Sequence, residues 1–237
     1  MLASELAEAL SKHGHIVKVI TSLPKQSAPR YEQKNTLYIR RCPTIPMPYK
    51  YAFFSLELFK ALDIDVNVAH FMSCLPTFFN WYGVLHYYIR KKPLVFTTVW
   101  PSLLRIHLYK GIKKVLGIFY DLKLVKYLLK PVDVVVSLTE SEMLFFKHLL
   151  QDKMICVIPE GVHLPTSIPS NEEILGLKTR YGIGDDEYIL ICVGRVHPTK
   201  RLEYALYAMR HICNKLPSTK LIPVSYTHLT LPTTERV

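Results

Sequence analysis

Short apolar runs alternate along this chain with segments whose apolar residues recur at helical spacing. The run from Ile189 to Val193 is unbroken, as expected of a strand buried on both faces of a parallel sheet. The segment from Leu2 to Leu10 instead repeats leucine at every fourth position, which is typical of a helix. The whole pattern predicts strands at residues 16–21, 36–41, 65–71, 94–99, 132–138, 154–158 and 189–193, and helices at residues 2–12, 51–62, 75–91, 103–129, 140–150 and 202–213.

This alternation of strands and helices predicts an α/β fold built on a doubly wound, Rossmann-like parallel sheet. A first domain is expected over residues 1–164, and the polar stretch near Pro165–Asn171 opens an interdomain link over residues 165–187. Residues 188–223 would then supply the first strand and helix of a second domain. Residues 224–237 break the earlier pattern and are expected to lie outside the fold.

Basic residues exceed acidic ones, and the formal net charge is +11. No zinc-finger spacing or RNA-binding signature accompanies this charge, so nucleic-acid binding is not expected. Between Arg105 and Lys130 the basic residues are interleaved with bulky apolar ones, which favours helices lying on an anionic membrane surface. A helix pair with solvated lysines is the alternative.

Cysteine usage and hydropathy bound the class of protein further. No run of about 18 uncharged apolar residues occurs, so no membrane-spanning helix is predicted. The 5 cysteines are scattered without a C-x-x-C pair, which indicates reduced thiols in a cytosolic protein. No metal-ligating cluster stands out, and no metal or other cofactor is expected. We therefore expect a cytoplasmic protein that associates with membranes from their surface.

A glycine and two cations follow the strand at 189–193. Gly194 is expected to turn the backbone tightly, and Arg195 and Lys200 stand just before a helix for which Thr199 is the expected N-cap. A helix N-terminus favours anions through its free N–H groups and its dipole, and basic side chains strengthen that preference. This segment therefore predicts a phosphate or pyrophosphate site.

Three segments resemble, in the same order, motifs of the retaining glycosyltransferases of family 4, which have the GT-B fold. The segment Leu6–Val17 is similar to their Leu-Ala-x-x-Leu-x-x-x-Gly-His-x-Val signature. Pro159–His163 is similar to Pro-Asn-Gly-Val-Asp, and Gly194–Lys200 is similar to Gly-Arg-(Val/Leu)-x-x-x-Lys. The resemblance implies that Arg195 and Lys200 contact the phosphates of a nucleotide-sugar donor. It also implies retaining transfer without a metal, in which the leaving phosphate helps to deprotonate the acceptor.

Acceptor contacts are expected beyond the carboxyl ends of the strands, where open α/β sheets bind ligands. The candidates that line this edge are His70, Thr98, Trp100, Glu140, Ser141, Glu160 and Gly161. His70 is expected at the end of a strand, with a purely structural histidine as the alternative. Glu140 and Ser141 could equally cap the following helix.

Several positions depart from the family's pattern. The family's Thr-x-His reads Thr97-Thr98-Val99 here, and Trp100 follows, so a sugar contact from that histidine is missing. Glu160 and His163 stand where the family has Asn and Asp, which leaves Gly161 as the matching residue. A glutamate pair expected later in the second domain has no counterpart in this chain. Trp100 could stack on a sugar or a lipid instead.

Both ends of the chain differ from what the resemblance implies. The family's first strand and glycine-rich loop have no counterpart before Leu2, and residues 224–233 resemble the translation of a sequencing adapter. The expectation is therefore a fragment without measurable transferase activity, from a parent enzyme that acts on an acceptor suggested to be lipid-linked. One alternative is a non-catalytic GT-B module that acts as a scaffold or partner subunit. Another is an epimerase or a phosphorylase of the same architecture.

Overall fold

The computed structural model describes residues 2–23, 28–46, 53–73, 78–98, 111, 115, 123–161, 167–194, 196 and 200–225. The chain divides into two compact units, Met1–Val162 and His163–Val237. Each unit is built around parallel strands joined through helices, as the alternating pattern predicts.

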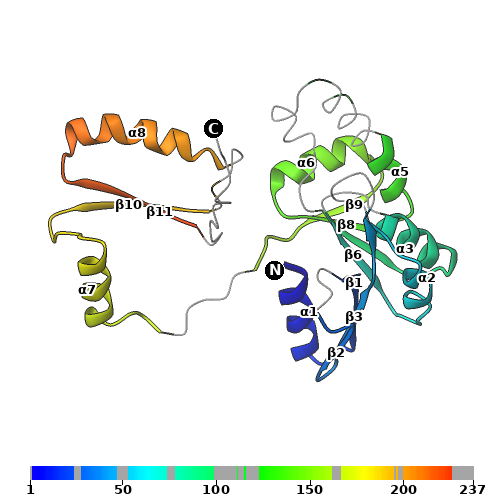
Figure 1. The fold of residues 1–237 in the computed structure, drawn as a ribbon. Helices are drawn as coiled ribbons and strands as arrows, with labels where there is room; N and C mark the ends of the chain where they lie inside the picture. Colours follow the sequence, from blue (N-terminus) through cyan, green and yellow to red (C-terminus); the bar gives the residue numbers. More distant parts are fainter. Residues whose placement is uncertain are drawn as a thin grey trace, which may run out of the picture. The chain divides into compact units, whose positions relative to one another are not determined.

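Four parallel strands form the larger sheet of the first unit, in the order β6-β7-β8-β9 (Figure 1). They are β6 (Ala69–Ser73), β7 (Leu94–Thr98), β8 (Val134–Ser137) and β9 (Met154–Val157). The helices between them are α3 (Phe78–Ile89), α5 (Val125–Leu129) and α6 (Glu140–Leu149). Because each strand is added beside its predecessor and parallel crossovers are right-handed, these helices cover the same face of the sheet.

The core of the first unit lies between that sheet face and the three helices. Leu94 and Val135 point from the sheet into this core, and both are almost completely buried. Burial of each such aliphatic side chain contributes roughly 1.5–3 kcal/mol. The helices contribute Val84, Tyr87, Leu128, Leu129, Phe146 and Leu150. These residues repeat at helical spacing in the sequence, which is why the pattern predicts their helices.

A smaller sheet of the first unit holds β1 (Val17–Ser22), β2 (Tyr31–Lys34) and β3 (Leu37–Cys42). Strand β1 pairs with β3 in parallel, and β2 pairs with β3 in antiparallel. Helix α1 (Leu2–Lys12) packs on β1 and β3, and the hydroxyl groups of Ser11 and Thr36 lie 2.8 Å apart. The short elements β4 (Ile45–Pro46), β5 (Phe53–Phe54) and α2 (Glu57–Ala61) follow.

The second unit contains α7 (Asn171–Arg180), β10 (Tyr188–Val193), α8 (Leu202–Lys215) and β11 (Thr219–Val224). Strands β10 and β11 pair in parallel, and α8 packs on β11 (Figure 1). Helix α7 begins with a capping box, because Ser170 accepts from the Glu173 N–H while the Glu173 carboxylate accepts from the Ser170 N–H. The described residues of α7 and α8 bury no side chain completely.

Several sequence predictions are wrong in detail. The helix expected at 51–62 is confined to α2, and β5 occupies part of that range. Strand β4, which includes Pro46, lies where no strand is predicted. The N-cap of α8 is Arg201 and not the expected Thr199. Helix α8 begins at Leu202, directly after Arg201, which adopts a left-handed conformation (φ 53°).

Five of the described elements were absent from the sequence prediction. They are β2, β4, β5, α7 and β11. Helix α7 lies within the stretch expected to be a link, although its Ser-x-x-Glu capping signal is readable in the sequence. Strand β11 extends to Val224, whose partner in the parallel register is Val193, so this residue belongs to the fold. Much of the range 103–129 lies outside the described residues, and α5 is the helix found there.

Candidate functional site

The carboxyl ends of the four larger-sheet strands lie along one edge of the first unit, because the strands are parallel. Thr98 is the last residue of β7. Glu140 and Ser141 open α6 soon after β8, and Glu160 and Gly161 follow β9. The structure therefore brings these predicted residues to the edge at which ligands of parallel sheets collect.

The residues at this edge differ in what they can offer a ligand. Glu140, Ser141, Glu160 and Gly161 are exposed. Thr98 is buried, and its hydroxyl donates to the carbonyl oxygen of Val136 at 3.2 Å. Thr98 thus joins β7 to β8, while the carboxylates and hydroxyl at 140, 141 and 160 are available to accept or donate hydrogen bonds.

The N-terminus of α6 is capped by residues other than the two predicted. Thr139 is the N-cap, and its hydroxyl oxygen accepts the N–H of Glu142 at 3.2 Å. The buried carboxylate of Glu142 accepts the N–H of Leu138 at 2.9 Å. Neither Glu140 nor Ser141 makes these bonds. Both side chains stay exposed at the carboxyl edge of the sheet. The Thr-x-x-Glu spacing in the sequence is the signal that could have identified this cap.

His70 is the second residue of β6 and not its last, because the strand continues to Ser73. The prediction that His70 ends a strand is therefore wrong. The apolar run stops at Phe71, but the backbone pairing with β7 extends the strand by two residues. Ala69 and Phe71 face the core, so the alternation of a strand places His70 on the opposite face of the sheet.

A hydrogen bond joins His70 to the neighbouring strand. Its Nε2 atom lies 2.7 Å from Oγ1 of Thr97, which is buried. The protein atoms around the ring desolvate it and lower the pKa of His70 below the usual 6.5. Although the residue keeps a solvent-exposed side, the ring is neutral near pH 7 and offers one donor and one acceptor nitrogen. Thr97 was not among the predicted residues, because pairing registers cannot be read from the sequence.

Two of the predicted site residues lie outside the described residues. They are Arg195 and Trp100. The other residues of the predicted phosphate site, Gly194 and Lys200, are both in the second unit, where Gly194 follows the carboxyl end of β10. The side chain of Lys200 lies beside Gly194, since its Cγ is 3.8 Å from the position that a Cβ on Gly194 would take.

Gly194 does not adopt the left-handed conformation that would require a glycine. A positive φ is found at Gly14, Gly111 and Gly182, but not at Gly194. Its N–H donates to the carbonyl oxygen of Val224 at 2.9 Å, which continues the β10–β11 pairing. The chain bends at Gly194 without the left-handed backbone that only glycine adopts easily. What glycine provides here is bare backbone beside the Lys200 side chain.

Metal-ligating side chains do not gather in the part of the chain that the structure describes. In that part, no group of three or more His, Cys, Asp or Glu side chains could hold a metal ion. The positive charge near the predicted phosphate site comes instead from lysine and arginine side chains. Whether the reaction uses a metal stays a prediction.

Comparison with solved structures supports the fold. The chain is similar to the sucrose-phosphate synthase of Thermosynechococcus elongatus, with a TM-score of 0.63 and 18% sequence identity. The match covers 92% of this chain and 54% of that one, so this chain spans about half the length of that enzyme. The similarity confirms an α/β fold of the GT-B type with a doubly wound parallel sheet.

Comparison of sequences identifies the family. No curated protein sequence matches this chain. The sequence profile of Glycosyltransferase Family 4, however, matches residues 2–165. That range contains the larger sheet, its carboxyl edge and two of the three motifs noted in the sequence. The match confirms the resemblance, and the chain belongs to glycosyltransferase family 4.

Proposed function

We propose that this chain is part of a glycosyltransferase that moves a sugar from a nucleotide-sugar donor to an acceptor and retains the anomeric configuration. The observation that carries the proposal is the Gly194–Lys200 segment at the carboxyl end of β10, in a chain whose first unit matches the family. The backbone of Gly194, which carries no side chain, lies there beside the aliphatic part of the Lys200 side chain. A diphosphate needs this combination of close backbone approach and positive charge.

The two cations of this segment, Arg195 and Lys200, would bind the donor. As the bond between the sugar and the phosphate breaks, negative charge grows on the departing diphosphate. Arg195 can hold two phosphate oxygens with its planar guanidinium, and Lys200 adds a point charge. Charge fixed in advance near the developing anion lowers the barrier without a metal ion.

The acceptor would bind at the carboxyl edge of the first unit. Glu140, Ser141 and Glu160 are exposed there and can bind the hydroxyl groups of an acceptor. Neutral His70 can add a hydrogen bond from the sheet face. The acceptor oxygen bonds to the anomeric carbon on the side that the phosphate leaves. Its proton passes to the departing phosphate oxygen, so no protein base is needed for that step.

Nucleotide binding tests the donor site directly. Saturation-transfer NMR and calorimetry with UDP, GDP and ADP would be performed on the chain and on its Lys200→Ala variant. Loss of one charge-assisted contact is expected to weaken binding at least about tenfold. Lys215→Ala is the matched control, because Lys215 is exposed in the last turn of α8, at the opposite end of that helix from Lys200.

Retention is tested with a nucleotide sugar in the longer enzyme of which this chain is proposed to be part, because the chain itself is expected to lack measurable transferase activity. If a labelled sugar is transferred to an alcohol, the proton coupling at its anomeric carbon should match that of the donor. An inverted product would refute the retaining mechanism. Equal binding of all three nucleotides by Lys200→Ala and by the unchanged chain would refute the donor site.

A further inference from the structure

Helix α3 carries apolar residues on its solvent side as well as on its core side. Val84 and Tyr87 pack into the core, whereas Leu85, Tyr88 and Ile89 are 55%, 56% and 68% exposed. The spacing of these three exposed residues places them on one stripe of the helix. A helix that is apolar on both sides usually covers a partner surface with its outer side.

Exposed lysines also stand on α5 and at the end of α3. Lys126 is on α5, Lys130 is the C-cap of that helix one turn later, and Tyr127 between them is 64% exposed. Lys91 follows the end of α3 and is exposed as well. Among the described residues, none of these three lysines forms an ion pair. Aromatic and aliphatic side chains surrounded by unpaired lysines are typical of a surface that binds anionic lipids.

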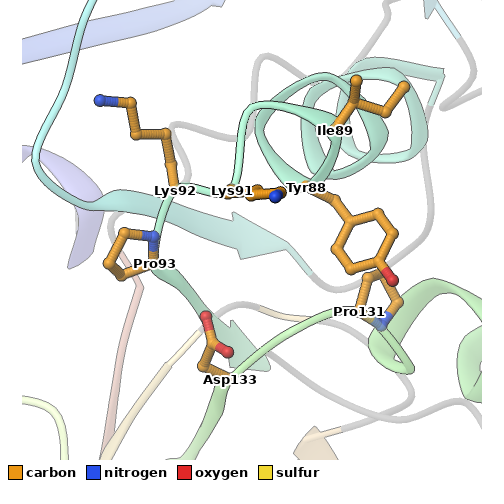
Figure 2. Close-up of a pocket in the computed structure, with 7 residues that line it drawn as sticks. All are labelled: Tyr88, Ile89, Lys91, Lys92, Pro93, Pro131 and Asp133. Atoms are coloured by element: carbon orange, nitrogen blue, oxygen red, sulfur yellow. The ribbon is translucent and has the colours of Figure 1, made fainter.

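A pocket of about 620 Å³ lies between the ends of the two helices, as Figure 2 shows. Tyr88 and Ile89 of α3 line it together with Lys91, and Pro131 lines it from the end of α5. In Figure 2 the Tyr88 ring lies next to Pro131. The pocket is large enough for a lipid headgroup, and Lys91 lines it beside the apolar Tyr88 and Ile89.

The acidic groups near this pocket are already engaged. The Asp133 carboxylate, which lines the pocket, accepts the N–H of Leu94 at 2.7 Å. Asp63 pairs with Arg90 at 2.5 Å, and Asp65 pairs with Lys92 at 2.6 Å. The Lys92 ion pair lowers the pKa of Asp65. Asp63 and Asp65 are therefore neutralised by their ion pairs, whereas Asp133 keeps its negative charge at the pocket, and the positive charge of the surface comes from Lys91, Lys126 and Lys130.

The backbone at Lys91 is one that glycine would adopt more easily. Lys91 has a φ of 54°, and it ends α3 in a Schellman motif. Its N–H donates to the Tyr88 carbonyl, and the Lys92 N–H donates to the Tyr87 carbonyl, both at 3.0 Å. A lysine at this left-handed position costs about 1 kcal/mol relative to glycine. The cation thus stands beside the pocket at a cost to stability.

We propose that the outer side of α3 and α5, defined by Tyr88, Ile89, Lys91, Lys126, Tyr127 and Lys130, is a docking surface for an anionic lipid bilayer. The lysines contact lipid phosphates, and the aromatic and aliphatic side chains enter the interface between headgroups and acyl chains. Pro93 and Pro131 lie at the amino ends of β7 and β8, so this surface is distinct from the carboxyl edge. Its proposed role is separate from the transfer reaction. No described helix is both long and apolar enough to cross a bilayer.

Vesicle co-sedimentation tests this surface. The chain is expected to bind vesicles of phosphatidylcholine with phosphatidylglycerol, and not vesicles of phosphatidylcholine alone. The Lys91→Glu/Lys130→Glu variant should lose at least about tenfold in affinity. The control Lys12→Glu/Lys215→Glu changes the net charge equally at exposed sites on α1 and α8, and it should bind as the unchanged chain does.

A second variant separates lost binding from lost folding. Lys91→Gly removes the cation but relieves the left-handed strain, so it should unfold at a higher temperature and still bind anionic vesicles more weakly. Amide hydrogen exchange should also slow in α3 and α5 when vesicles are added. Binding that the control variant loses equally, or that free inorganic phosphate competes away, would overturn the proposal. Lys200→Ala should leave vesicle binding unchanged, which separates this proposal from the donor site.

Discussion

The Nε2 atom of His70 lies 2.7 Å from Oγ1 of Thr97, across two adjacent parallel strands. His70 is in β6 and Thr97 is in β7, so the pair depends on the register of these strands and not on proximity in sequence. The bond orients the imidazole on the sheet face that the core helices leave uncovered. It turns a residue predicted as an edge contact into a fixed, neutral hydrogen-bonding group.

Acid is expected to destabilise the first unit through His70. Desolvation lowers its folded-state pKa below 6.5, so the unfolded chain binds the proton more readily. The contribution of neutral His70 to the free energy of unfolding is complete above the unfolded pKa of 6.5. It is lost as the pH falls toward the lower pKa of the folded state. Urea unfolding at about pH 7.5 and about pH 5.5 should show a smaller loss in His70→Asn than in the unchanged chain.

His86 provides a comparison for this titration. Desolvation and the nearby Arg90 lower the pKa of His86 too, so His86→Asn should remove a separate part of the acid sensitivity. A His70→Asn chain that keeps the full pH dependence would contradict the assignment to His70.

Gly83→Ala is expected to destabilise the first unit by about 1–3 kcal/mol. A Cβ at Gly83 would stand 2.5 Å from Cε1 of Phe71, whose ring packs against Phe96 and Tyr87 in the core. Gly176→Ala in α7 is the matched helical control, because a Cβ there has no atom within 4 Å. It should stabilise α7 by about 0.5–1 kcal/mol. Amide hydrogen exchange in each helix measures both effects, and equal effects of the two changes would refute the close packing.

Glu142→Ala is expected to cost about 1–3 kcal/mol more than Glu140→Ala in the free energy of unfolding. Both changes remove one negative charge from the first turn of α6, which alone is worth about 0.3–1 kcal/mol. Only Glu142 accepts the N–H of Leu138, and its loss leaves that N–H without an acceptor. Urea denaturation of the two variants isolates this bond. Equal costs would show that the carboxylate contributes only through its charge.

Much of the candidate site could be predicted from short segments. The apolar run of β10 followed by glycine and two cations indicated a phosphate site, and residues at or just after strand ends, such as Thr98 and Glu160, indicated an acceptor edge. These signals are local, since each concerns a strand and the residues that follow it. The partners of the side chains could not be predicted in this way. Thr97, Glu142 and Leu138 enter only through strand register and helix capping geometry.

The sequence by itself determined the class of fold and the order of its elements. Hydrophobic periodicity is set by how each segment buries one face or both, so it identified β7, β9, β10 and α6 and the parallel α/β arrangement. The tertiary structure alone decided which side chains meet. It placed His70 against Thr97 and Phe71 against Gly83, and it left Leu85, Tyr88 and Ile89 of α3 exposed. The physical reason is that strand pairing and helix packing join residues far apart in the chain, and no local pattern encodes those contacts.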